Sequence, residues 1–189
     1  MKNLSKYPTI LKLQQVFKMG YTPSRGKESY SEIKYFYIPN CFAHACFNLT
    51  NQQLSNFKEA DKHAFRGFVQ SILQLDKYIA KDLFDFVKLC GLKVQKSNRS
   101  LPKHDNEWKV AIYFGSERLK KDYHFLLQEK DGSWSGKHGE TDQVTFYPEA
   151  PKYLDYNFEF PYKLYGIYKI TNPYAPKKAT EDIEKEHEI

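Results

Sequence analysis

The sequence predicts an α+β fold in which a helical N-terminal half packs on a C-terminal antiparallel sheet. Apolar residues recur at helical spacing up to about residue 90, whereas short alternating runs separated by turn residues follow from Trp108 onward. Helices and strands that occupy separate halves of a chain are typical of α+β proteins. We expect one domain over residues 1–174 and a charged, flexible tail over residues 175–189.

The helical half contains four segments with a helical pattern. They lie at residues 8–19, 41–49, 50–74 and 76–90. Gly20 and Gly91 follow the first and last segments, where a left-handed C-cap is expected. A short extended run, Ile33–Ile38, leads to Asn40, whose side chain suits the N-cap of the second segment.

The second half contains five strand-like runs. They lie at residues 108–114, 122–128, 134–137, 143–147 and 162–170. Lys130-Asp131-Gly132-Ser133 is a strong hairpin signal, because Asp-Gly accepts the positive φ angles of a tight turn. Residues 95–107 and 148–161 are expected to be loops.

Composition limits the class of protein. The chain has 189 residues, 41% of them apolar, and three cysteines with no CxxC pair, which argues against a disulfide framework. No apolar run resembles a signal peptide or reaches the roughly 18–20 residues of a membrane span. We therefore expect a cytoplasmic protein, or one delivered by a non-classical or injection route.

The charge pattern leaves the partner open. The formal charge is +6, and the tail from Ala175 to Ile189 carries five acids and three lysines, so the body alone carries +8. A solvated lysine surface explains this most simply, although a basic body also suits nucleic acid or an anionic surface. No nucleic-acid-binding motif, glycine-rich phosphate loop or metal-ligand spacing is present, so we expect no cofactor and no metal.

Cys41 is the candidate nucleophile. It opens the second helical segment, and free N–H groups and the helix dipole stabilise a thiolate at the first turn of a helix. Cys46 lies five residues further on and reads as a small core residue.

His124 is the candidate base, since it lies in a strand-like run and a thiol hydrolase needs an imidazole within reach of its nucleophile. His44 is a rival base, because it follows Cys41 by three residues on the same helix.

Two short blocks resemble the papain-like cysteine peptidase superfamily, nearest to its NlpC/P60 branch and to related small uncharacterised bacterial and phage proteins. The blocks are Asn40-Cys41 and the run from Asp122-Tyr123-His124-Phe125 through Asp131-Gly132-Ser133-Trp134-Ser135-Gly136-Lys137. The resemblance implies a papain-like domain over residues 1–174 and a cysteine peptidase or amidase that acts on a protein or peptide-like substrate. It makes no statement about the oligomeric state.

The resemblance also implies a polar residue that orients the base from the returning strand of the hairpin. That position falls on Gly136, which has no side chain. His138 lies on the same strand face and could serve if the strand slips or bulges, and Asp142 is the alternative. Ser135 points to the opposite face and suits the role less well.

The remaining site residues follow from the same resemblance. The oxyanion hole would use the backbone N–H of Cys41 with a donor from Tyr35, Tyr37 or Asn40. Trp134 is expected to pack beneath the site.

Three alternatives to hydrolysis stay open. They are a catalytically impaired papain-like module that binds a protein or nucleic acid, a thiol acyltransferase on the same fold, and a basic nucleic-acid binder with a different fold.

Overall fold

The computed structural model describes residues 8–26, 41–49, 53, 80–115, 123–138, 144–154 and 161–178. Within these ranges the protein is α+β, with a mostly antiparallel seven-stranded sheet and a few helices. The helices are α1 (Pro8–Lys18), α2 (Cys41–Cys46) and α5 (Ala80–Leu89). The strands are β1 (Lys93–Lys96), β2 (Glu107–Phe114), β3 (Tyr123–Gln128), β4 (Trp134–Lys137), β5 (Val144–Tyr147), β6 (Tyr153–Leu154) and β7 (Tyr162–Thr171).

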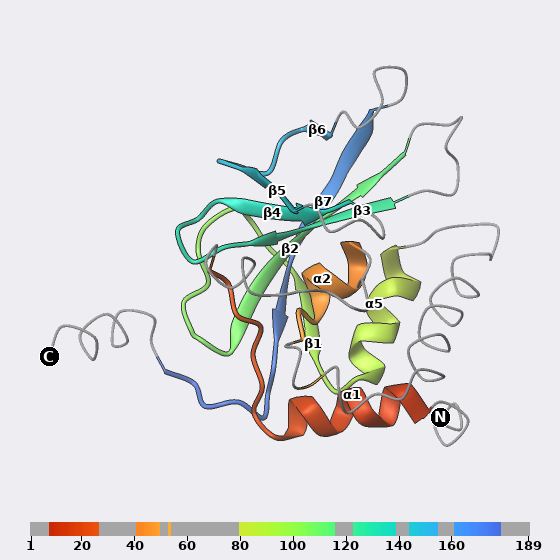
Figure 1. Ribbon diagram of the computed structural model, residues 1–189, viewed down its shortest axis with the longest axis vertical. Helices are drawn as coiled ribbons and strands as arrows, with labels where there is room; N and C mark the ends of the chain where they lie inside the picture. The colour runs from red at the N-terminus through yellow and green to blue at the C-terminus, as the bar shows by residue number, and fades with distance from the viewer. Residues whose placement is uncertain are drawn as a thin grey trace, which may run out of the picture.

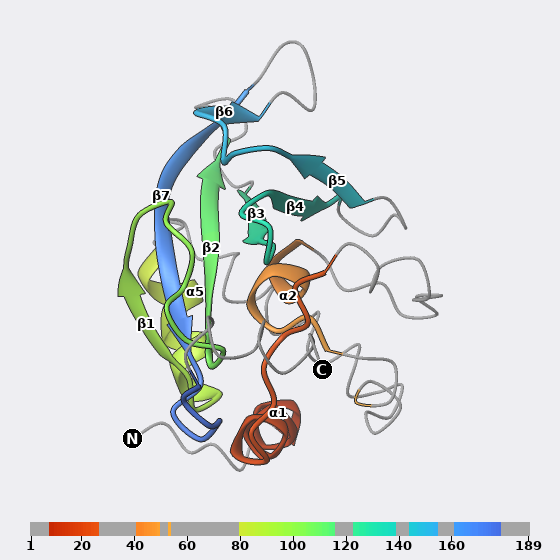
Figure 2. The ribbon, with the colours of Figure 1, turned by 90° about the vertical axis from the view of Figure 1, so that its left-hand side faces the viewer.

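The strands follow the order β1-β7-β2-β3-β4-β5, and β6 pairs with β7. Each of these pairings is antiparallel. The pairing of β2 with β7 shifts register between Ile112 and Tyr113, where a β-bulge increases the local twist. Figure 2 shows the resulting bend, with β3, β4 and β5 turned away from the plane of β1, β7 and β2.

Each face of the sheet carries its own core. The three described helices lie on one face (Figure 1), and their apolar side chains meet those of β2 and β3 in a helix-side core that includes Phe17, Phe42, Phe86 and Phe125. The opposite face carries a second core, to which β6 and the chain before it contribute. Its members are Ala111, Tyr113, Leu126, Trp134, Ala150, Leu154 and Ile167.

Most predicted elements among the described residues are confirmed. Gly20 and Gly91 have φ angles of 86° and 92°, as their C-cap positions require. The second helix is shorter than expected, because Asn48 adopts a φ of 35° and α2 already ends at Cys46. Ile33–Ile38 and almost all of residues 50–74 lie outside the described residues.

Two predicted loops were wrong in part. Residues 93–96 form β1, an edge strand in which Val94 packs on the core beside exposed Lys93 and Lys96, so the run carries little apolar signal. Residues 153 and 154 form β6, whose two residues are too few for a period to show.

The chain after β7 is hydrogen-bonded to the rest of the domain as far as Lys178, four residues beyond the expected domain end at residue 174. Lys178 N donates to Asp105 Oδ1 at 3.0 Å, and Asp105 N donates to the Lys178 carbonyl at 3.2 Å. Residues 179–189 lie outside the described residues. No helix in the described ranges is both long enough and apolar enough to cross a membrane.

Asn172 joins three elements at the end of β7. Its Nδ2 donates to the carbonyls of Phe17 at 2.9 Å and Tyr21 at 2.7 Å, which belong to α1 and the chain after it. Its backbone N–H donates to the Asn106 carbonyl at 2.9 Å, just before β2. The side chain is fully buried, so these bonds hold α1 against the sheet without competition from water.

Replacing Asn172 by alanine should therefore destabilise the protein. The partly buried Tyr21 carbonyl would lose its Asn172 donor and the Phe17 carbonyl would keep only Gly20 N–H, which costs about 1–3 kcal/mol of the free energy of unfolding. Urea unfolding followed by circular dichroism would measure the change, with Lys177→Ala, an exposed site five residues further on, as the control. Equal urea midpoints for the two variants would contradict the stabilising role of the Asn172 side chain.

Candidate active site

Cys41 begins α2, and its thiol approaches the start of β3. Sγ lies 3.9 Å from the carbonyl oxygen of Tyr123, the residue that precedes His124. Cys41 is 5% exposed, whereas Cys46 and Cys90 are fully buried. Because peptide dipoles add along a helix, the six residues of α2 favour a thiolate less than the longer helix expected from the sequence would.

The side chain of His124 lies on the face of β3 opposite to Cys41. Phe125 belongs to the helix-side core, and the ring of Tyr123 packs against that core. His124 instead meets Tyr162 of the second face, with ring centroids 6.4 Å apart. Successive strand residues alternate between faces. The structure therefore brings Cys41 to the backbone beside His124 without pointing the imidazole at the thiol.

His138 directly follows the neighbouring strand β4 and lies opposite His124. The hairpin pairs Leu126 with Gly136, and the same register continued by two residues pairs His124 with His138. Their ring centroids are 6.1 Å apart. No slip or bulge is needed, and Gly136 does not occupy the position opposite His124. His138 Nε2 also lies 2.8 Å from Thr145 Oγ1 on β5, so a polar row crosses three strands.

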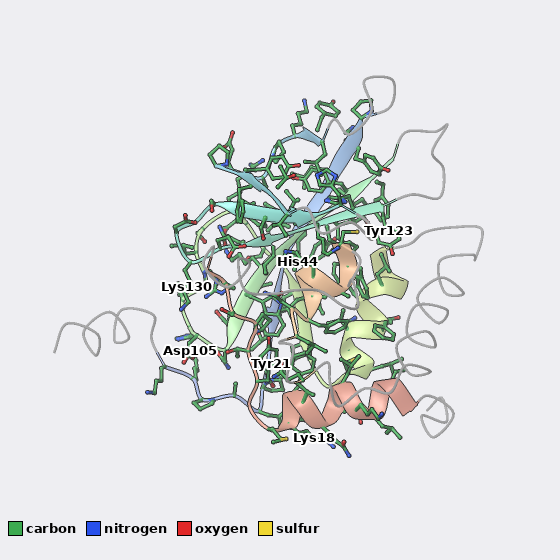
Figure 3. All side chains as sticks on the ribbon, in the orientation of Figure 1. Lys18, Tyr21, His44, Asp105, Tyr123 and Lys130 are labelled. Carbon is green, nitrogen blue, oxygen red and sulfur yellow. The ribbon has the colours of Figure 1, made fainter. Side chains whose placement is uncertain are left out.

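A buried polar contact links α2 to β4 on the helix side. His44 Nε2 lies 3.2 Å from Ser135 Oγ, and both residues are fully buried. Lys137 is fully buried too, on the same face of β4 as Ser135. Figure 3 shows His44 on α2 beneath the strands. The contact was missed from the sequence, because no pattern shows that α2 crosses β4.

Burial keeps these histidines neutral. Burial first, and then the charge of Lys137, lowers the pKa of His44 from 6.5 to about 3. Burial, followed by the charges of His138 and His44, lowers the pKa of His124 from 6.5 to about 3. The pKa of His138 is lowered by burial and then by Lys137. In this arrangement each imidazole accepts or donates hydrogen bonds as a neutral group.

The other two thiols are protonated. Burial raises the pKa of Cys90. The pKa of Cys46 is raised first by burial and then by the charges of the nearby Cys41 and Cys90. Since the thiolate is the nucleophile, neither thiol suits attack on a substrate. Cys41 thus remains the candidate nucleophile.

The remaining predicted residues are placed away from Cys41 or are not described. Trp134 is buried in the second core, opposite Gln128 and Tyr147, on the face of His124 and not beneath the thiol. Tyr35, Tyr37, Asn40 and Asp142 lie outside the described residues. Among the side chains that the structure describes, no group of three or more His, Cys, Asp or Glu is placed to hold a metal ion.

Comparisons with known proteins give no further information about the function of the chain. No family model, curated protein or solved structure matches the chain. The papain-like resemblance therefore rests on its two sequence blocks alone.

We expect the protein to lose stability as the pH falls below about 6.5. The folded-state pKa values of His44 and His124 lie below the unfolded value, so folding favours the neutral form. This contribution is complete above the unfolded pKa and is lost progressively as the pH falls toward about 3. Each histidine then contributes a slope of up to about 1.4 kcal/mol per pH unit.

Urea unfolding between about pH 7 and 5, where most carboxylates stay ionised, would measure that slope. In His44→Gln one titrating group is gone, while His124 and His138 still titrate, so the slope should fall by up to about half. An unchanged slope in this variant would contradict the prediction, because it would mean that the pKa of His44 is the same in the folded and the unfolded protein.

Proposed function

We propose that the chain is a cysteine hydrolase of the papain-like type, a peptidase or amidase that works through an acyl-thioester intermediate. The observation that carries the proposal is the approach of Cys41 Sγ to the start of β3, one residue before His124. The ring of His138, directly after β4, lies 6.1 Å from the His124 ring between centroids. A thiol, an imidazole and a polar group beside that imidazole are the parts that this chemistry requires.

Each part has a defined role in the proposed reaction. His124 takes the proton of the Cys41 thiol, and the sulfur attacks the carbonyl carbon of the substrate. The carbon–nitrogen bond breaks and His124 returns the proton to the leaving amine. Water, deprotonated by His124, then hydrolyses the thioester and frees Cys41. With an amine or alcohol in place of water, the same residues perform acyl transfer.

The reaction requires the His124 imidazole to turn toward Sγ. His124 is the second residue of β3, so the proposed reaction requires the imidazole to reach Sγ past Tyr123. A thiolate beside the ring would raise the pKa of His124, because an opposite charge favours the imidazolium. His138 would hold the turned ring by contact with its far side.

A second function is favoured by the position of the imidazole. His124 faces away from Cys41, and burial disfavours its protonated form. A papain-like module that binds a protein or nucleic acid without catalysis needs neither an active thiolate nor a mobile base. Under this reading the basic body, and not the thiol, would contact the partner.

Alkylation by iodoacetamide at neutral pH separates the two functions. We expect Cys41 to be labelled in preference to Cys46 and Cys90, since it alone retains exposed surface and the other two thiols are protonated. His124→Ala should slow labelling of Cys41 at least about tenfold, because the base that removes the thiol proton is lost. Peptide mass spectrometry after a time course gives the rate at each cysteine.

The control is His104→Ala, which removes a histidine from the loop before β2 and should leave the rate unchanged. As a second measurement, p-nitrophenyl acetate should transfer one acetyl group to Cys41 in the wild type and none in Cys41→Ala. Equal labelling of all three cysteines, or a rate that His124→Ala leaves unchanged, would overturn the hydrolase proposal in favour of the binding module.

A further inference from the structure

A pocket of about 230 Å³ lies between the loop at residues 97–104 and strands β2 and β7. It is separate from the candidate active site. His124 pairs with Tyr113, which is four residues along β2 from the pocket residue Lys109, or about 14 Å at the usual strand rise. Asp105, next to the pocket in the chain, and Tyr123, next to His124, lie on opposite sides of the molecule in Figure 3.

The pocket carries uncompensated positive charge. Lys109 and Lys169 stand directly opposite each other on β2 and β7, and like charges in such a pair destabilise a sheet. Glu107 compensates one of them, with its Oε1 2.5 Å from Lys169 Nζ. Lys103 also lines the pocket, so three lysines face one glutamate and the formal charge of the lining is +2.

Lys109 supplies charge but no free hydrogen. Its ammonium donates to the Asn98 carbonyl and to Ser100 Oγ, both at 3.1 Å, and to the Ser100 carbonyl. These oxygens occupy its three N–H groups and hold it in place as a cation. Burial first, and then repulsion from Lys169, lowers the pKa of Lys109, and Glu107 offsets this only in part. A negative ligand would relieve that repulsion.

Two other lysines can donate to such a ligand. Lys169 uses one hydrogen on Glu107 and has three in all, and Lys103 is exposed at the pocket. Ser97 also lines the pocket. The volume falls below the roughly 300–1,000 Å³ of pockets for drug-sized ligands, so a small group fits better than an extended one.

We propose that this pocket binds a small tetrahedral oxyanion, a phosphate or sulfate group, free or as a small monoester. The anion would lie between Lys103 and Lys169, with Lys109 behind it as a fixed charge. Lysine binds phosphate as a point charge, which suits a site built from ammonium groups without arginine. Glu107 opposes the anion and sets a limit on its affinity.

Thermal unfolding in the presence of inorganic phosphate tests the proposal. At constant ionic strength, replacing sodium chloride by sodium phosphate should raise Tm by about 2–4 °C. The double variant Lys103→Gln/Lys169→Gln should lose this increase and bind phosphate at least tenfold more weakly. Glu107→Gln should bind it at least tenfold more tightly, because the repelling carboxylate is gone. Lys163→Gln, exposed at the far end of β7, is the matched control and should behave as the wild type.

Glycerol phosphate and sulfate form the other arms of the experiment. A Tm increase with glycerol phosphate equal to or greater than that with phosphate assigns the pocket to a monoester, and an increase with inorganic anions alone assigns it to a free oxyanion. The proposal is wrong if the Tm increase is the same in the double variant as in Lys163→Gln, since phosphate would then act as a general stabilising salt. It is also wrong if Glu107→Gln leaves the affinity unchanged.

Discussion

The burial of β3 on both faces is the constraint that places every candidate residue. Phe125 and Leu127 enter the helix-side core, and Leu126 between them enters the second core. A shift of the strand by one residue would exchange the two sets and leave both cores poorly filled. The alternation that fills the cores therefore also determines which way the candidate site residues face. It turns Tyr123 toward α2 and Cys41, and it turns His124 toward the opposite face.

The sequence predicts the fold class well, because period and turn chemistry are local properties. The helix at the N-terminus and the strands of the central sheet carry clear patterns, and the glycines after α1 and α5 mark their ends. The failures occur where tertiary contacts decide. The edge strand β1 has one core-facing apolar residue, Val94, and so resembles a loop. The early end of α2 depends on Asn48, whose Nδ2 donates to the Ser24 carbonyl at 2.7 Å and whose carbonyl accepts from the Tyr21 hydroxyl.

The candidate site was predictable in part, and the register of its hairpin can be read from the turn. The family resemblance placed the orienting position on Gly136, about a dozen residues after His124. The turn itself gives a different answer, because Glu129 N donates to the Ser133 carbonyl at 2.8 Å and Gly132 has a φ of 87°. A three-residue turn with glycine in the left-handed position fixes the register, and counting outward from it places His138 opposite His124. The face on which these histidines lie could not be read in the same way, because β3 is apolar on both sides of His124.

The placement of thiol and imidazole on opposite faces of one strand restricts where they can act together. Within the sheet, the backbone of β3 and the pairing with β2 separate the two side chains. The separation ends at Tyr123, the first residue of β3, where the Cys41 sulfur already contacts the backbone. In the proposed reaction, the carbonyl group attacked by Cys41 and the leaving group protonated by His124 would therefore both lie at this end of the sheet. The buried contact of His44 with Ser135, which pairs with Leu127 four residues along β3, anchors α2 on β4 as well, because an unpaired polar group in that interface would cost more than the contact itself contributes. The geometry of α2 on β3 and β4, more than the strength of the helix dipole, thus determines whether Cys41 acts as a nucleophile.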